Sequence, residues 1–424
     1  MRLRHFVPTF LLSLVGFMAL GQKMDPFSKV PNKYPILKKV LSDPDTYKVQ
    51  IRYTQIDRAR DNTPGFTDFE FNLDDEIYYY PASTVKLPVA ILALEWLEEQ
   101  RILGLGAETT MLSYSSRPSQ TLAFSDLTAP DRLPSIGHYI KKILLVSDND
   151  AYNRLYELLG QDYINEKLRA KGLGHTIINH RLSMPMSEVE NRHFNPIRFV
   201  DEIGHPVFEL PGRETFKVYS NEAGPTIGKA YMSQGELVSQ PLDFTYKNKF
   251  ALSDFHGTVM RIVFPEKFEP EQRFHISEPH REFILKYMSM LPKESDYPLF
   301  PQPEFYDSFS KFFKFGTDER PIPERFRIFN KTGNAYGHLL DGGYFVDFKS
   351  GVEFFVSAVI YANADGVLND DKYEYEEIAF PFFAELGDYL YHFERKRTRK
   401  RRPDLSEFKF VYKVPNSPFF SLRK

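Results

Sequence analysis

Ser83 and Lys86 are the two residues of this sequence whose types and spacing best suit covalent chemistry. A serine hydroxyl is a weak nucleophile that needs a nearby base, and residues three apart at the start of a helix lie on one face. A lysine held in a dry, electropositive site loses part of its proton affinity and can then act as that base. The same Ser-x-x-Lys spacing recurs at Ser308/Lys311 and Ser406/Lys409. Only Ser83 opens a long apolar helix, although a serine there could also be a simple helix cap beside a solvated lysine.

Two further tripeptides could complete such a site. Ser147-Asp148-Asn149 separates two expected helices, where the serine could relay a proton and the asparagine could bind a substrate amide. Lys331-Thr332-Gly333 opens an expected edge strand, where lysine and threonine could bind a carboxylate and glycine would let a ligand lie against the backbone. Each also has a plainer interpretation: the first as ordinary helix-capping residues, the second as a strand start or turn.

Taken in order, the three motifs resemble those of the class A β-lactamases and penicillin-binding proteins, which are penicillin-recognising serine hydrolases. Tyr80-Pro81-Ala82 before the serine and Leu87-Pro88-Val89-Ala90 after the lysine are similar to the same family. So is the strand pair that follows Lys331-Thr332-Gly333. The resemblance extends roughly over residues 34–393 and is weakest in the middle of the chain.

The resemblance implies that the reaction proceeds through an acyl-enzyme. Ser83 would be acylated by a β-lactam or a D-alanyl peptide, with Lys86 as its base partner or proton shuttle. Ser147 would then pass the proton to the leaving nitrogen. No metal or cofactor would be required.

The resemblance also implies a set of substrate-binding residues. Asn149 would bind the side-chain amide of the substrate, and the Lys331 strand would bind its carboxylate. The backbone N–H groups of Ser83 and Asn334 would form the oxyanion hole, which is usually a large catalytic contribution. The binding residues are therefore expected to be Asn149, Lys331, Thr332, Gly333 and Asn334. Asn334 stands where the family usually has serine or threonine.

The loop that should hydrolyse the acyl-enzyme departs from the family. Class A β-lactamases use a glutamate in the pattern Glu-x-x-x-Asn, and Arg181-Leu182 resembles the start of that loop. Counting back four residues from Asn191 gives Ser187 rather than glutamate. Glu188 lies one residue out of register and Glu190 adjoins Asn191. We interpret Glu188 as the deacylating base, with both glutamates as solvated loop residues in the alternative.

The elements that would position these motifs follow from the hydrophobic pattern. Helices are expected at 34–41, 83–101, 136–146, 151–159, 253–263 and 376–393, and strands at 47–57, 66–72, 326–330, 342–348 and 352–361. This order predicts an α/β (α+β) protein with a β-lactamase-like three-layer fold. Its antiparallel sheet would form from both chain ends and pack on a helical subdomain. The separation of 184 positions from Ser147 to Lys331 indicates an atypical insertion around 204–323.

Composition and the N-terminal residues bear on the class of protein and its compartment. The chain has no cysteine, which excludes disulfides and thiolate chemistry, and its net charge of −3 gives no global basic field for nucleic acid. Arg2 and Arg4 precede an apolar stretch, which resembles a signal peptide over 1–21 and predicts a periplasmic or secreted protein; an uncut membrane anchor is the alternative. No later segment is apolar enough for a transmembrane span in the mature chain.

The remaining boundaries and functions are set by the same resemblance. The serine hydrolase domain is expected over 34–394, followed by a basic and aromatic tail over 395–424. The basic run 395–402 is either a solvated helix end or a contact for an anionic cell envelope. The leading function is hydrolysis of a small-molecule β-lactam. The alternatives are a D,D-peptidase or related penicillin-binding hydrolase, and a sensor that is acylated with little turnover.

Overall fold

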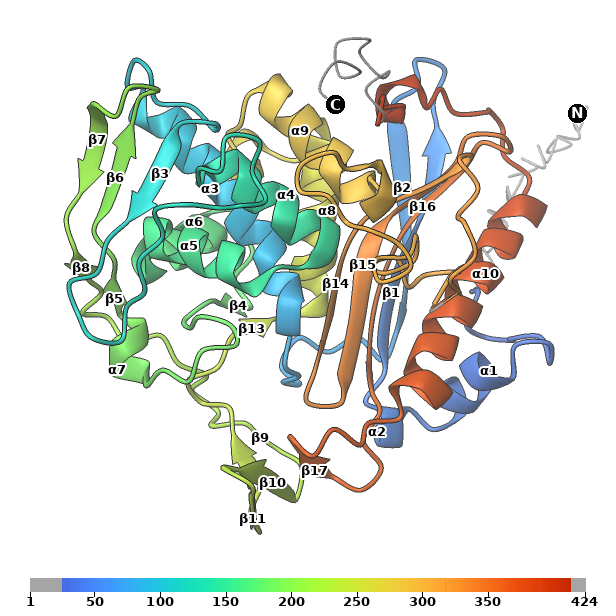
Figure 1. Ribbon diagram of the computed structural model, residues 1–424. Helices are drawn as coiled ribbons and strands as arrows, with labels where there is room; N and C mark the ends of the chain where they lie inside the picture. The colour runs from blue at the N-terminus through green and yellow to red at the C-terminus, as the bar shows by residue number, and fades with distance from the viewer. Residues whose placement is uncertain (1–24, 317, 413–424) are drawn as a thin grey trace, which may run out of the picture.

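A computed structural model of the protein describes residues 25–316 and 318–412. Its centre is a five-stranded antiparallel sheet in the order β14-β15-β16-β1-β2 (Figure 1). The strands are β1 (Gln50–Arg58), β2 (Pro64–Phe71), β14 (Phe326–Ala335), β15 (His338–Asp347) and β16 (Val352–Tyr361). The sheet therefore combines strands from both ends of the chain, as predicted. The predicted signal peptide over 1–21 lies outside the described residues.

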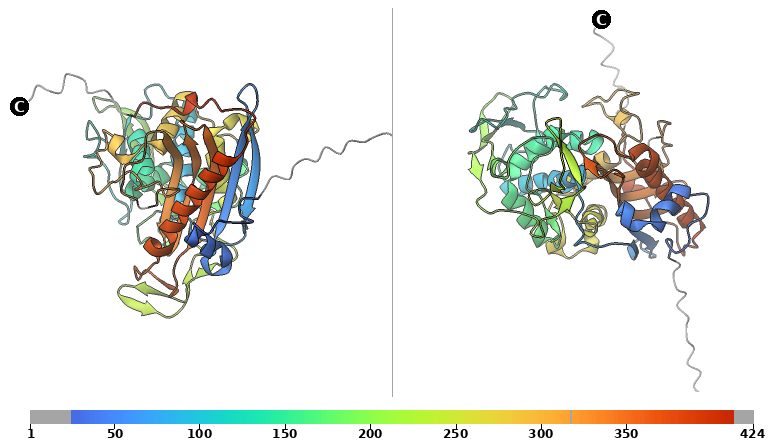
Figure 2. Two further views of the ribbon diagram at one scale, coloured as in Figure 1. Left: turned by 90° about the vertical axis from the view of Figure 1, so that its right-hand side faces the viewer. Right: turned by 90° about the horizontal axis from the view of Figure 1, so that it is seen from below.

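Helices cover both faces of this sheet and make a molecule of three layers (Figures 1 and 2). α1 (Pro35–Ser42) and α10 (Phe380–Lys396) lie together on one face. On the other face α8 (Leu252–Val263) packs against the middle strands, and α9 (Glu278–Ser289) packs against β14. Because both faces are covered, every residue of β15 and β16 is buried. The predicted fold class is confirmed.

Four helices form the subdomain beside the sheet: α3 (Lys86–Gln100), α4 (Ile136–Val146), α5 (Asn149–Leu159) and α6 (Gln161–Ala170). α3 runs through the middle of this group, and every residue from Lys86 to Leu97 is buried. A helix that is buried on all sides needs no polar stripe. The ionisable side chain of Lys86 is therefore held inside the protein rather than in solvent.

The region around 204–323, predicted as one insertion, contributes to several parts of the molecule. α8 and α9 pack on the central sheet, and β7 (Pro206–Leu210) joins β3 (Thr110–Ser113) and β6 (Ile197–Val200) in a small sheet. A β arm extends at the bottom of Figure 1, where β10 pairs with the late strand β17. The arm and β17 comprise β9 (Thr226–Ile227), β10 (Ala230–Ser233), β11 (Glu236–Val238), β12 (Leu242–Asp243) and β17 (Val367–Leu368).

The remaining elements are short. They are α2 (Pro44–Tyr47), β4 (Thr176–Ile177), α7 (Glu188–Asn191), β5 (His193–Phe194), β8 (Arg213–Glu214) and β13 (Lys249–Phe250). Several short 3₁₀ segments and a π-helical segment, Tyr375–Ala379, complete the described structure. Over 25–316 and 318–412, no helix has both the length and the apolar character needed to cross a membrane.

Candidate active site

Ser83 lies in a sharp turn that leads into the central helix α3. The preceding residue, Ala82, has a φ of 48°, in the left-handed region that residues with a side chain seldom adopt. The 3₁₀ helix Ala82–Val85 follows, and Thr84 Oγ1 donates a hydrogen bond to Pro81 O at 2.7 Å. Ser83 is half-buried, whereas its neighbours in the turn are buried. Strain of this kind persists where the surrounding structure enforces it, and here it leaves the serine as the accessible residue.

Lys86 is completely buried one helical turn after Ser83. Its Nζ donates hydrogen bonds to the backbone oxygen of Ser147, to Ser147 Oγ at 3.2 Å and to Asn149 Oδ1 at 2.7 Å. Burial lowers the pKa of Lys86 to about 7, against the opposing effect of the Asp148 charge. The three acceptors are neutral, so they replace the lost hydration of an ammonium group only in part. Lys86 can therefore carry a neutral amine near neutral pH, as a general base must.

Lys331 reaches the same hydroxyl from the central sheet. Its Nζ donates to Ser147 Oγ at 2.8 Å and to Thr332 O at 2.8 Å. Ser147 ends α4 with a φ of 63°, in the left-handed region. Burial and the neighbouring Lys86 charge lower the pKa of Lys331 well below its usual value. A carboxylate bound here would offset both effects, so the site favours an anionic ligand.

β14 comes into direct contact with the Ser83 turn at Gly333. A Cβ atom on Gly333 would lie 2.9 Å from Ser83 N and 3.0 Å from Pro81 O, which leaves no room for a larger residue. Thr332 is buried beside it, and Asn334 is exposed and pairs with Leu339 on β15. The strand continues to residue 335, beyond the predicted end at 330, because β15 pairs with it throughout. The Lys-Thr-Gly motif thus lies against the turn that carries Ser83.

Asn149 connects this cluster to the loop after α6. Its Oδ1 accepts from Lys86, and its Nδ2 donates to Ser183 Oγ at 2.8 Å. Both ends of the carboxamide are therefore held in place. Ser183 was not predicted as a site residue, although it directly follows Arg181-Leu182, the expected start of the loop. Its place directly after Arg181-Leu182 was the signal that could have identified it. The Glu-x-x-x-Asn pattern, counted back from Asn191, led to Ser187 and Glu188 instead.

Glu188 belongs to the same loop but makes a different contact. It is the first residue of α7, and its Oε1 lies 2.7 Å from Arg192 Nε. Glu190 caps the same helix, with its Oε2 accepting from Ser187 N at 3.0 Å. Among the described residues, neither glutamate shares a hydrogen bond or ion pair with the lysine and serine cluster. The role of Glu188 as deacylating base stays a prediction.

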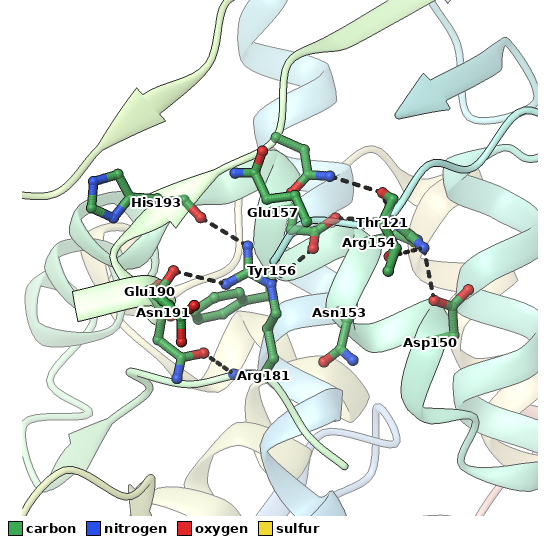
Figure 3. Close-up of polar contacts among 12 residues, drawn as sticks. Thr121, Asp150, Asn153, Arg154, Tyr156, Glu157, Arg181, Glu190, Asn191 and His193 are labelled. Atoms are coloured by element: carbon green, nitrogen blue, oxygen red, sulfur yellow. Dashed lines mark hydrogen bonds and ion pairs between the residues drawn. The ribbon is translucent and has the colours of Figure 1, made fainter. Parts of the chain in front are cut away.

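A buried arginine fixes the position of this loop (Figure 3). Arg181 Nε donates to Glu157 Oε1 at 2.8 Å, and Arg181 Nη2 donates to His193 O at 2.9 Å. Its backbone N–H donates to Asn191 Oδ1 at 2.9 Å. Burial raises the pKa of the Glu157 carboxyl, while the charges of Arg181 and Arg154 oppose that shift. Both ends of the segment from 181 to 193 are thereby tied to α5.

A third buried lysine, Lys311, contacts β14 at the residue that precedes Lys331. Lys311 Nζ donates to Asn330 Oδ1 at 2.7 Å and to Met288 O at 2.8 Å, and Asn330 Nδ2 donates to Asp341 Oδ1 at 2.6 Å. Burial lowers the pKa of Lys311 and raises that of Asp341. The network fixes Asn330, which immediately precedes Lys331. The second Ser-x-x-Lys pattern therefore contributes a positioning residue rather than another nucleophile.

The assembled cluster contains hydroxyl, amine and amide groups in one place. It contains the hydroxyls of Ser83 and Ser147, the amine of Lys86 with its lowered pKa, and the amine of Lys331, which a bound carboxylate would help to keep protonated. Such groups can take up a proton, return it to a leaving group and bind an anion. Elsewhere in the described ranges, as here, no three His, Asp or Glu side chains gather as metal ligands.

Comparison with known proteins gives one match in sequence and several in structure. Residues 35–242 match the sequence model of the Beta-lactamase enzyme family. The matched segment includes both the Ser-x-x-Lys and Ser-Asp-Asn motifs and ends before Lys331-Thr332-Gly333. No curated protein matches the chain.

Three of the similar solved structures are each 14% identical in sequence to this chain. The β-lactamase from Sphaerobacter thermophilus superimposes with a TM-score of 0.46, over 84% of this chain and 97% of that chain. The β-lactamase from Francisella tularensis also gives 0.46, over 85% and 98%. The protein PBP-A gives 0.45, over 85% and 96%.

Proposed function

Since residues 35–242 match the sequence model of the Beta-lactamase enzyme family, we propose that this protein is a serine hydrolase acylated at Ser83 by β-lactams and related D-alanyl amides. The observation that carries the proposal is the meeting of Lys86 and Lys331 on the hydroxyl of Ser147. The close approach of Gly333 to the Ser83 turn supports the proposal, because Gly333 follows Lys331 by two residues on the same strand. The proposal includes export to the periplasm or the exterior, which rests on the apolar stretch over 6–20.

In the acylation step, Ser83 Oγ attacks the amide carbonyl and its proton passes to neutral Lys86. The N–H groups of Ser83 and Asn334 stabilise the negative charge that develops on the carbonyl oxygen. As the C–N bond breaks, the Ser147 hydroxyl gives its proton to the leaving nitrogen and regains one from Lys86. One proton leaves the serine and one reaches the nitrogen, so Lys86 ends the step neutral and ready for the next substrate.

Lys331 supplies the charge that binds the substrate carboxylate. Lys331→Ala is expected to lower kcat/KM for carboxylate-bearing substrates by about 10- to 100-fold, the loss expected for one charge-assisted hydrogen bond. Neutral ester analogues of the same substrates should lose much less. Parallel acylation kinetics on each acid and its ester measure the difference. Equal losses for both would mean that Lys331 acts through folding or general electrostatics.

For the second half of the reaction, the geometry favours a long-lived acyl-enzyme. Ester hydrolysis needs a group that can deprotonate water, and a serine hydroxyl is a poor base. Ser183 is the loop residue that contacts Asn149, whereas the carboxylate of Glu188 pairs with Arg192. We therefore favour a penicillin-binding hydrolase or acylated sensor. A β-lactamase that uses Glu188 is the second candidate, supported by the family match.

Ser183→Glu is expected to convert slow turnover into faster hydrolysis, because it places a carboxylate beside Asn149. Stopped-flow with a chromogenic cephalosporin should show an acylation burst in the wild type with slow steady-state turnover. The variant should keep the burst and raise the steady-state rate by about 100-fold, the lower range for general base catalysis.

Glu188→Gln is the matched control for that experiment. If Glu188 plays no part, both phases of the wild type persist in this variant. A preserved burst with loss of steady-state hydrolysis would instead establish Glu188 as the base and favour the β-lactamase candidate. Fast wild-type turnover that Glu188→Gln leaves unchanged would contradict both assignments.

A further inference from the structure

Five arginines line one hollow at the end of the central sheet, where β15 turns into β16. This arginine hollow has a volume of about 340 Å³. Its lining residues are Ser350, Val352, Arg395, Arg397, Arg399, Arg401 and Arg402. The chain as a whole carries a net charge of −3, so this concentration of positive charge is local. No acidic side chain is among the lining residues.

Most of this charge is not neutralised by the protein. Arg397 pairs with Asp57 and with Glu394, and Arg399 Nε lies 3.7 Å from the same Glu394 carboxylate. The other three arginines of the hollow form no ion pair within the described residues. The residues outside that description contain no Asp or Glu in their sequence. Two carboxylates therefore form the ion pairs that the described residues make with these five guanidinium groups.

The arginines are fixed to the turn by neutral acceptors. Arg399 Nη1 donates to Gly351 O, and Arg402 Nη2 donates to Lys349 O at 2.8 Å. Gly351 has a φ of 67°, and a Cβ there would lie 3.2 Å from Arg402 Cγ, so a glycine lets the arginine lie close. Backbone oxygens orient a guanidinium group but do not cancel its charge. Arg399 Nε is also buried without a hydrogen-bond partner.

From this arrangement we propose that the arginine hollow binds a ligand carrying clustered phosphate groups. Guanidinium groups donate in a planar fork that matches phosphate oxygens, and they remain charged at any physiological pH. Several guanidinium groups around one small hollow can together donate hydrogen bonds to the oxygens of a multiply charged anion. A single carboxylate would leave most of the positive charge in place.

This site lies apart from the proposed catalytic site. Lys331 pairs with Gly342 on β15, and the strand runs on to Asp347 before it reaches the turn at the hollow. At about 3.3 Å per residue, the strand separates the two sites by more than about 15 Å. Ligand binding in the hollow would thus leave the Ser83 turn free, because the ligand would bind at the end of the sheet remote from that turn.

The test is a binding titration of the full chain by isothermal calorimetry with sodium tripolyphosphate. The variant pair Arg395→Gln/Arg401→Gln removes two exposed arginines that form no ion pair among the described residues. Arg101→Gln/Arg132→Gln is the matched control, because it removes the same charge from exposed positions in the helical half. The wild type and the control should bind alike, and the hollow variant should bind at least about tenfold more weakly. Binding should weaken steeply as salt is raised.

Three further measurements test the source of the anion, the preference for phosphate and the independence of this site from the catalytic one. Sedimentation with phosphatidylcholine vesicles, with and without phosphatidic acid, tests a lipid headgroup; binding only to tripolyphosphate indicates a free polyphosphate instead. Citrate binding as tight as tripolyphosphate would overturn the preference for phosphate. Absence of binding, or equal loss in the control pair, would overturn the site itself. Penicillin labelling at Ser83 should be the same in all variants, which separates this proposal from the catalytic one.

Discussion

Replacement of Ser83 by alanine is expected to abolish covalent labelling by a fluorescent penicillin while the protein remains folded. The substitution removes only the attacking oxygen. No hydrogen bond of the Ser83 hydroxyl is present among the described residues, so the folded state loses little. Gel fluorescence and intact-protein mass measure the labelling, and circular dichroism with a thermal melt checks the fold.

The chain offers its own control for this experiment. Ser406 has the same Ser-x-x-Lys spacing to Lys409 but begins an isolated 3₁₀ turn, Ser406–Phe408. Ser406→Ala should label as fully as the wild type. A labelled peptide that lacks Ser83 would falsify the assignment of the nucleophile.

The second large effect is expected at Lys86. Lys86→Ala should slow acylation by about 10³-fold, since proton transfer by a positioned base contributes about 10²- to 10⁴-fold. The pre-steady-state burst with a chromogenic cephalosporin measures this rate directly. Lys409→Ala, the counterpart in the control motif, should leave the rate unchanged. An unaffected rate in Lys86→Ala would mean that the lysine only supports the fold.

The pH dependence of wild-type acylation follows from the same side chain. Burial lowers the pKa of Lys86 to about 7, and the base must be neutral to accept the serine proton. The acylation rate should therefore rise with pH up to about 7 and level off above it. A solvated lysine would give a rate that still rises towards its ordinary pKa of about 10.4. A profile of the latter kind would exclude Lys86 as the base.

Elements whose signals are local could be predicted from the sequence. α4 has the predicted bounds because its apolar residues recur at helical spacing and Ser135 Oγ caps it, accepting from His138 N at 3.1 Å. The strands of the central sheet were predicted from apolar runs, although β15 begins four residues before its predicted start and the edge strand β14 proved longer. Its last residues, with Gly333 and Asn334, are held by pairing with β15, and a single segment does not reveal its partner.

Other features depend on contacts that leave no local pattern. β13 pairs with β4, and β10 of the arm pairs with β17, all from distant segments of two to four residues. Strands this short have too few residues to show a period of two. Ser183 was missed for a similar reason, since its contact with Asn149 depends on how Arg181 is buried against Glu157. Sequence supplied the three motifs, but only the fold shows that two lysines share one hydroxyl.

The way the central sheet is closed has a consequence for how the protein is made. β1 lies between β2 and β16, with Gln50 opposite Val359, so the sheet cannot be completed until the strands within 326–361 have been synthesised. Pairing between such distant segments is slow compared with local contacts. Lys331 can bind Ser147 Oγ beside Lys86 only after these strands have paired. The segment 35–242 lacks three of the five strands of the central sheet, so a nascent chain stays without its lysine and serine cluster until those strands have emerged.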